Sequence, residues 1–380
     1  MSWKEEEWNN IDIISENFIS RYQRHGTVYI CTEEKNDSYC FIKNMLDMLN
    51  INNTFLKKGN VNINNYPLLI TDGADNEYLS KRGYEENCSF FVVYRSLRSD
   101  FFRKELPLVY YKLFNKIYIH SVQISLTSRC ILKCKDCCNG CNKWDKKDKS
   151  NDISWEDAKE TIDNTFKNID YIGEIILVGG ESLLCQSAIR EILKYLFNKY
   201  RTRFNEIIIY TNFGVPILDI TLKSFIEYSS MLRLMVSQYT KIVPKISKNF
   251  FYNLLLCKKN NIKYDILEYR GESWIDYKMF LVSHSDEEAN MIAYQCYLHF
   301  YSRCQEIHKD KLYYCCQGYV NSKNSNIDIN KIQYLDLKKI KNDPVYSIKF
   351  IRGLNEDRDL FLCRHCNGVG KNIIAAMQES

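Results

Sequence analysis

The sequence predicts an α/β protein in three parts, and three observations lead to this prediction. Short apolar runs of strand character alternate with segments of helical periodicity along most of the 380 residues. Five or six strand–helix units follow one another in the middle of the chain. Most of the 16 cysteines fall in two groups, one early in the middle part and one near the end. We therefore expect a small α/β domain over 1–117, a barrel domain over 118–290 and a cysteine-rich domain over 291–380.

The composition is that of an ordinary globular protein, with 45% hydrophobic and 26% charged residues and a net charge of +5. The first residues lack the apolar core of a signal peptide, and no apolar run reaches the ~20 residues of a membrane span. We therefore expect a cytoplasmic protein with no membrane partner. In that compartment many cysteines indicate metal or redox chemistry rather than disulfides. No nucleic-acid motif is present, so no nucleic-acid partner is expected.

The first part has the pattern of a small parallel, Rossmann-like α/β domain. Its first strand–helix turn, 31–37, contains no glycine, so its backbone has no special freedom to wrap a pyrophosphate. Two interpretations stay open, a degenerate or substrate-presenting domain and an active dinucleotide site. The predicted strands are 27–31, 67–71 and 89–94, and the predicted helices are 5–22, 41–49 and 100–116, the last interrupted near Pro107.

The middle part repeats a strand–turn–helix rhythm, which predicts a partial or full barrel with right-handed crossovers. In such barrels the chemistry lies at the C-terminal ends of the strands, and the motifs described below fall at those ends. The predicted strands are 117–126, 174–178, 206–210, 232–236 and 263–268, and the predicted helices are 187–200, 217–228 and 246–260.

Three cysteines directly after the first barrel strand, Cys130, Cys134 and Cys137, have the spacing C-x3-C-x2-C. Thiolates are the usual ligands of iron–sulfur clusters. The grouping resembles the radical S-adenosylmethionine (radical SAM) enzymes, in a partial (β/α)6 TIM-type barrel. The resemblance implies a [4Fe-4S] cluster whose open iron chelates S-adenosylmethionine. Asp136 departs from the family, which usually has an aromatic residue there. A zinc site or unliganded thiols are the alternative, and the adjacent Cys138 and Cys141 are expected to be spare thiols.

Three further strand ends match cofactor-binding motifs of that family. Gly179-Gly180-Glu181 resembles the GGE motif, whose carboxylate bonds the amino group of S-adenosylmethionine. Thr211-Asn212 resembles the T-N-G turn, and Ser237 stands where a serine often reaches the ribose or carboxylate. The alternative is that these residues only form tight turns. The predicted cofactor-binding residues are therefore Gly179, Gly180, Glu181, Thr211, Asn212 and Ser237.

The last part resembles the auxiliary-cluster domain called twitch, the shorter relative of SPASM, which ligates a second [4Fe-4S] cluster. A β-hairpin is predicted over 305–308 and 311–314, with its turn at Lys309-Asp310. The fourth ligand is either Cys296, which fits the family spacing better, or Cys304, which stands opposite Cys315 in the hairpin register. A zinc knuckle is the alternative. The candidate metal ligands of this part are Cys296, Cys304, Cys315, Cys363 and Cys366.

The resemblance implies an oxidoreductase or isomerase that cleaves S-adenosylmethionine reductively to a 5′-deoxyadenosyl radical. The expected substrate is small and polar, sugar-like or nucleotide-linked, and is oxidised or epimerised after hydrogen abstraction. A flavodoxin or ferredoxin would supply the electron. A peptide-modifying enzyme and a non-catalytic iron–sulfur or zinc protein are the alternatives. Cys185 and Tyr239 are considered as hydrogen donors for an epimerisation, and Arg270 as a clamp for an anionic group.

Overall fold

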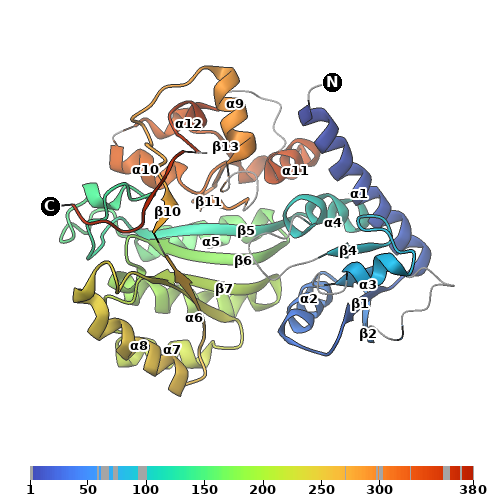
Figure 1. Cartoon of the computed structure of the whole chain (residues 1–380), viewed down its shortest axis with the longest axis horizontal. Helices are drawn as coiled ribbons and strands as arrows, with labels where there is room; N and C mark the ends of the chain where they lie inside the picture. The colour runs from blue at the N-terminus through green and yellow to red at the C-terminus, as the bar shows by residue number, and fades with distance from the viewer. Residues whose placement is uncertain are drawn as a thin grey trace.

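The computed structural model is a mixed α/β structure with a four-stranded and an eight-stranded sheet, both rich in parallel strands, and a separate two-stranded sheet (Figure 1). It describes residues 3–57, 60, 68–71, 76–92, 101–269, 271–296, 298, 303–325, 327–353, 360–368 and 370–379. Within these ranges, no helix combines the length and the apolar character that crossing a bilayer requires.

The N-terminal part is a four-stranded parallel sheet in the order β2-β1-β3-β4. Its strands and helices are α1 (Trp3–His25), β1 (Val28–Thr32), α2 (Asp37–Met48), β2 (Asn53–Lys57), β3 (Leu68–Thr71), α3 (Asn76–Lys81) and β4 (Phe90–Val92). The three predicted strands are confirmed. Strand β2 was not predicted, because its side chains are half-buried or exposed and give no clear apolar run. Phe18 of α1 and Met45 of α2 are fully buried against β1 and β3.

A helical connection leads from this sheet to the large one. It begins as a π-helical turn, Phe101–Glu105, and continues as α4 (Leu106–Phe114). The predicted interruption near Pro107 is thus a change of helix type, since proline suits the first turn of a new α-helix. Asn115, in the left-handed conformation at φ 55°, ends α4.

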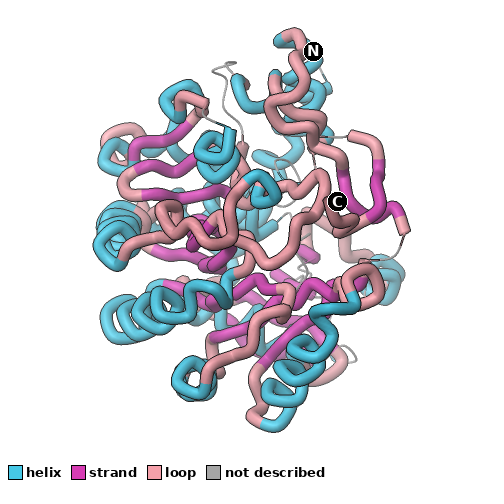
Figure 2. The backbone as a smooth tube through the Cα atoms, turned by 90° about the vertical axis from the view of Figure 1, so that its left-hand side faces the viewer, coloured by secondary structure: helices cyan, strands magenta, loops and turns pink. Residues whose placement is uncertain are grey.

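The large sheet has the strand order β13-β12-β11-β5-β6-β7-β8-β9. Strands β5 to β9 are parallel to one another, and β11 joins the outer edge of β5, also in parallel. Helices lie around the outside of these strands (Figure 2). The elements are β5 (Tyr118–Thr127), α5 (Trp155–Asn168), β6 (Tyr171–Gly179), α6 (Gln186–Tyr200), β7 (Phe204–Thr211), α7 (Asp219–Glu227), β8 (Leu232–Gln238), α8 (Ser247–Lys259) and β9 (Lys263–Glu268).

Every predicted strand of the middle part is present. Strands β5 to β8 are rich in apolar residues that the sheet buries, whereas β9 is mostly exposed. Helix α5 was not predicted. Its start follows a charged loop, and the local sign of a helix is Ser154, whose hydroxyl accepts a bond from the amide of Asp157. The largest core lies between these strands and their helices and includes Ile124, Leu177 and Ile209.

The C-terminal part extends the large sheet and then returns across it. The predicted hairpin is confirmed as β11 and β12, with Ile307 opposite Leu312. A separate two-stranded sheet pairs β10 with β14, which is near the end of the chain. The elements are β10 (Glu272–Ile275), α9 (Asp286–Gln295), β11 (Gln305–His308), β12 (Lys311–Tyr313), α10 (Gly318–Ser325), β13 (Tyr334–Asp336), α11 (Pro344–Arg352), α12 (Phe361–Arg364) and β14 (Asn372–Ile374).

Candidate iron–sulfur site

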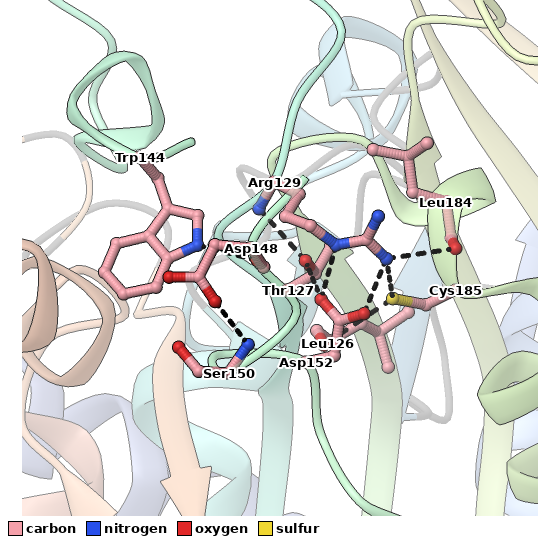
Figure 3. A network of polar contacts seen from close by, with 9 residues as sticks. All are labelled: Leu126, Thr127, Arg129, Trp144, Asp148, Ser150, Asp152, Leu184 and Cys185. Atoms are coloured by element: carbon pink, nitrogen blue, oxygen red, sulfur yellow. Dashed lines mark hydrogen bonds and ion pairs between the residues drawn. The ribbon is translucent and has the colours of Figure 1, made fainter. Parts of the chain in front are cut away.

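An ion pair between the buried Arg129 and the half-buried Asp152 anchors the loop that carries the first three cysteines (Figure 3). Arg129, which directly precedes Cys130, donates two bonds to Asp152, from Nε to Oδ1 at 2.8 Å and from Nη2 to Oδ2 at 2.5 Å. The Thr127 hydroxyl at the end of β5 also donates to Asp152 and accepts a bond from the Arg129 amide. Both ends of the loop between β5 and α5 are therefore tied to the same carboxylate.

Cys130, Cys134 and Cys137 pack into one small cluster of side chains beyond the end of β5, with Leu132, Val243, Ile246 and Ala376 among the apolar members. Three N–H groups point at two of the sulfurs. Cys130 Sγ accepts from the Leu132 amide at 3.4 Å and from Asn212 Nδ2 at 3.8 Å, and Cys134 Sγ accepts from Gln378 Nε2 at 3.2 Å. Donors of this kind suit an electron-rich sulfur, as in a thiolate bound to iron.

Burial governs how these thiols ionise in the absence of metal. It raises the pKa of Cys130, with the Glu181 carboxylate adding to the effect, and raises the pKa of Cys134 to about 12. A hydrogen bond from the Cys141 thiol lowers the pKa of Cys137 to about 7. Cys141, expected to be a spare thiol, therefore supports a candidate ligand.

The chemistry of the donor set fits an iron–sulfur cluster. Three sulfur donors lie in one apolar cluster, and two of them already receive N–H groups. In the described part of the chain, no three His, Cys, Asp or Glu side chains are close enough together to hold a metal ion.

The glycines that follow β6 allow the cysteine loop to lie against the strand end. A Cβ atom on Gly180 would stand 2.3 Å from the carbonyl oxygen of Arg129, and one on Gly179 would stand 2.7 Å from that of Thr127. The amides of Gly180 and Glu181 donate to these same two carbonyl groups, each at 2.9 Å. The backbone of 127–129 is therefore in direct contact with that of 179–181, and this contact fixes the position of Cys130.

Glu181 joins the ends of β6 and β7 through its carboxylate, which has no exposed surface. Its Oε1 accepts from the Thr211 hydroxyl at 2.6 Å and from the Leu183 amide at 2.9 Å, and its Oε2 accepts from the Asn212 amide at 2.7 Å. Burial raises the pKa of Glu181 despite these bonds. Three predicted cofactor-binding residues thus form one network, and Asn212 extends it to Cys130.

Ser237 lies at the end of β8, half-buried, and forms a side-chain hydrogen bond with Tyr239. Tyr239 stacks on Tyr269 with ring centroids 5.2 Å apart and meets the edge of Trp274 at 5.8 Å. All three rings pack in the same cluster as the first three cysteines. Aromatic surface therefore reaches this site from the end of β8 and from the segment around β10. Asp136, where the resemblance predicts an aromatic residue, has the left-handed backbone conformation, at φ 58°.

The second group of cysteines divides between two places. A small, largely apolar cavity lies between α9, the turn after β12 and α12. Its lining includes the four thiols of Cys296, Cys315, Cys363 and Cys366. Cys304 instead packs on the inner face of the large sheet, which is the face opposite the one covered by α5 and α6. There it contacts Ile176, Ile208 and Met235. Cys296, rather than Cys304, therefore shares a cavity with Cys315, Cys363 and Cys366.

Several further residues bear on the earlier interpretations. Cys185, considered as a hydrogen donor, is buried beneath Arg129, which approaches its sulfur at 3.8 Å. Arg270 lies outside the described residues. Sequence reasoning missed Arg129, Asp152 and Gln378. The position of Arg129 beside Cys130 was a usable signal, whereas Gln378 gave none, since its contact spans 244 positions.

Comparison with known proteins gives two findings. Residues 122–238 match the model of a family described as a 4Fe-4S single cluster domain. Among solved structures, anSMEcpe with bound AdoMet and the Cp18Cys peptide is similar at 17% identity and a TM-score of 0.30, over 38% of this chain and 42% of that chain. A tagged form of anSMEcpe with bound AdoMet is similar at 15% identity and a TM-score of 0.31, with the same coverage. No curated protein matches the chain.

The family match confirms the predicted 4Fe-4S cluster domain over 122–238, a range that includes Cys130, Cys134 and Cys137. The matched part corresponds to less than half the length of the similar structures.

Proposed function

We propose that this chain is a radical SAM enzyme in which Cys130, Cys134 and Cys137 hold the catalytic [4Fe-4S] cluster. One observation carries the proposal. The three thiols at the end of β5 meet the network that Glu181 forms with Thr211 and Asn212, at the ends of the two neighbouring strands. Parallel strands bring these ends to one edge, where α/β proteins of this kind place their cofactors.

When bound there, the cluster and S-adenosylmethionine would supply a 5′-deoxyadenosyl radical that abstracts a hydrogen atom from the substrate. The residues at the site hold and orient these groups. Gly179 and Gly180 keep the cysteine loop against β6. Glu181 and Thr211 fix the turn that carries Asn212, and Ser237 presents a hydroxyl at the next strand end. We expect the cofactor to lie across these strand ends, near Asn212 and Ser237.

The four thiols of Cys296, Cys315, Cys363 and Cys366 would hold the auxiliary [4Fe-4S] cluster. Their common cavity supports this set over one that includes Cys304. The open run of parallel strands β5 to β9 with outer helices is compatible with a partial barrel of the radical SAM type. We propose a Rossmann-like domain over 1–117, the core over 118–290 and the auxiliary-cluster domain over 291–380, in a cytoplasmic enzyme reduced by a flavodoxin or ferredoxin.

A small polar substrate, sugar-like or nucleotide-linked, is the first candidate. The inner face of the large sheet supports it, since polar groups stand among its apolar ones. The half-buried Ser125 hydroxyl donates to the buried carboxylate of Glu306, and Val320 of α10 donates its amide to the same carboxylate. Such groups can orient hydroxyl substituents of a substrate. Oxidation and epimerisation both begin with the same hydrogen abstraction.

A peptide is the second candidate substrate. In the described part of the sheet, β9 is an edge strand with β8 as its neighbour, and its residues are mostly exposed. An edge of this kind can pair with an extended peptide. The solved anSMEcpe structure contains a bound peptide, Cp18Cys.

The central test is anaerobic reconstitution followed by reduction with S-adenosylmethionine. We expect about eight irons per chain, four for each cluster, and release of 5′-deoxyadenosine. The triple variant Cys130→Ala, Cys134→Ala, Cys137→Ala should keep about half of the iron and release none of the nucleoside. Zinc in place of iron, or cleavage by the triple variant, would disprove the proposal.

Deuterium then identifies the substrate class. Deuterated sugars, sugar nucleotides and cysteine- or serine-containing peptides are supplied in parallel to the reconstituted enzyme. Transfer of label into 5′-deoxyadenosine from one class alone identifies the carbon that is attacked. A product lighter by two hydrogens indicates oxidation, whereas solvent hydrogen incorporated at the same carbon indicates epimerisation.

A further inference from the structure

The end of the chain forms a strap over the loop that carries Cys134. This C-terminal strap, residues 372–379, starts as β14, which pairs with β10, and then crosses to the cysteine loop (Figure 1). Ala375 and Ala376 have no exposed surface. Cys134 and Gln378 form an antiparallel bridge, in which Lys135 donates its amide to Met377 at 2.6 Å and Glu379 donates to Lys133 at 2.7 Å. The strap is thus bonded to the backbone on both sides of Cys134.

The side chain of Gln378 is held in one orientation. Its Oε1 accepts from the Lys133 amide at 3.0 Å, and its Nε2 donates to the Ala376 carbonyl at 2.8 Å and to Cys134 Sγ at 3.2 Å. Exchanging the amide oxygen and nitrogen would place donor against donor at Lys133 and acceptor against acceptor at Ala376. The second N–H of Gln378 is therefore directed at the sulfur by its other two bonds.

We propose that Gln378 is a positioning residue for the catalytic cluster, through an N–H···S bond to the Cys134 ligand. This inference rests on the proposed function. Such bonds to cluster sulfurs stabilise the more negative, reduced state and so raise the reduction potential. The effect is strengthened by the surroundings, because Cys134 is buried among Leu132, Val243 and Ala376, where the dielectric constant is low. The far end of the chain thereby helps to set the electron affinity of the cluster.

The test is the midpoint potential of the catalytic cluster in the reconstituted full-length protein. It is followed by electron paramagnetic resonance, using the signal that changes when S-adenosylmethionine is added. Gln378→Ala removes the donor, so its potential should be more negative than that of the wild type. Gln378→Glu preserves the acceptor for Lys133 and the size of the side chain but places a negative charge beside the sulfur, so it should shift the potential further.

Glu379→Ala is the matched control, since Glu379 is also on the strap and its Oε1 accepts from Asn142 without contacting a sulfur. Its potential should not become more negative than that of the wild type, because the loss of a negative charge near Cys134 can only favour the reduced cluster. Wild-type potentials in both Gln378 variants would overturn the inference, as would an equal shift in Glu379→Ala. If Gln378→Ala fails to retain its cluster, the nearly isosteric Gln378→Glu decides alone. A wild type without the SAM-sensitive signal would instead disprove the proposed function.

Discussion

At the scale of single residues, a contact between two backbone segments decides which residue can occupy position 180 beside the cysteine loop. Gly180 was predicted from a motif in which glycine lets the chain approach a ligand. The structure gives the glycine a further reason, since the missing Cβ makes room for the Arg129 carbonyl. Such a contact connects residues that are 51 positions apart, so the motif alone could not reveal it.

Gly180→Ala should lower the free energy of unfolding by about 3 kcal/mol, because the rigid backbone of the neighbouring loop has to move. Urea titration of the variant against the wild type measures this difference. Gly26→Ala is the control. Its Cβ would meet nothing within 4 Å, and at φ +67° it should cost only about 1 kcal/mol of backbone strain. Equal losses in both variants would show that the contact with Arg129 has no special weight.

His308 should make the fold sensitive to mild acid. Burial, helped by the positive charge of Lys323, lowers its pKa to about 4, and the neutral ring contacts the Tyr319 hydroxyl at 3.0 Å. The unfolded chain binds a proton near pH 6.5, where the folded chain does not. The stability due to neutral His308 is therefore complete above pH 6.5 and is lost as the pH falls towards 4.

His308→Gln should remove this part of the pH dependence. Through His308, the free energy of unfolding of the wild type should fall by up to about 3 kcal/mol between pH 7 and pH 4. The variant lacks this contribution, so its free energy of unfolding should fall less over the same range. Urea titrations at several pH values over this range provide the comparison. Parallel stability curves for the two proteins would contradict the assignment of this effect to His308.

At the scale of elements, the periodicity of the sequence predicted most strands of the large sheet. It did not predict the contacts between segments that are far apart in the chain. The strands β5 to β8 are rich in buried apolar residues, and each strand from β5 to β9 was predicted close to its observed position. Helix α5 was missed because a charged loop obscures its start. The pairing of β14 with β10 and of Gln378 with Cys134 depends on contacts between distant parts of the chain, for which local sequence carries no signal.

The same limit applies to the auxiliary cysteines. Spacing left Cys296 and Cys304 as alternatives, and hairpin register counted in favour of Cys304. In the structure Cys304 precedes β11 and packs on the inner face of the sheet, whereas Cys296 ends α9 beside the other thiols. Tertiary packing decides which side of a sheet a loop cysteine reaches. The spacing of the cysteines along the chain does not determine it.

The loop between β5 and α5 should depend on its anchor at Asp152. Asp152→Ala leaves the Arg129 guanidinium, whose side chain is 8% exposed, without its carboxylate partner. Removing one member of such a buried pair should cost about 3 kcal/mol. Limited proteolysis should then cut the variant within 128–152 sooner than the wild type.

Lys159→Ala is the control for this comparison. Its ion pair with Asp163 is at the surface, on α5, and should contribute less than about 1 kcal/mol. The cleavage pattern of this variant should therefore remain that of the wild type. Similar cleavage in the Asp152 and Lys159 variants would mean that the anchor does not restrain the loop.

At the scale of the whole molecule, the C-terminal part connects regions that are far apart in the sequence. Helix α10 follows Cys315, and its Asn321 donates to the Cys138 carbonyl at 2.8 Å, while Gln123 of β5 donates to the Cys316 carbonyl at 2.9 Å. Buried amides thus join the two groups of cysteines. These bonds hold the loop of Cys138 and the segment of Cys316 in place relative to α10 and β5.

A second connection runs from α11 to the N-terminal part. The buried Arg352 pairs with Asp12 of α1 at 2.7 Å and donates to the carbonyl of Lys104 before α4. Since α1 also packs on the small sheet, this arginine joins both ends of the chain. Arg352→Ala should therefore loosen α1 without disturbing the middle of the large sheet.

Hydrogen–deuterium exchange measures this effect segment by segment. Amides of α1 should exchange about tenfold faster in Arg352→Ala, which corresponds to a loss of about 1.4 kcal/mol in local stability, while those of β6 and β7 keep their wild-type rates. Lys112→Ala removes an exposed ion pair between α4 and α1 and serves as the control, with unchanged exchange. Faster exchange throughout the chain would mean that Arg352 supports one cooperative unit, whereas unchanged exchange in α1 would mean that other contacts hold the N-terminal part in place.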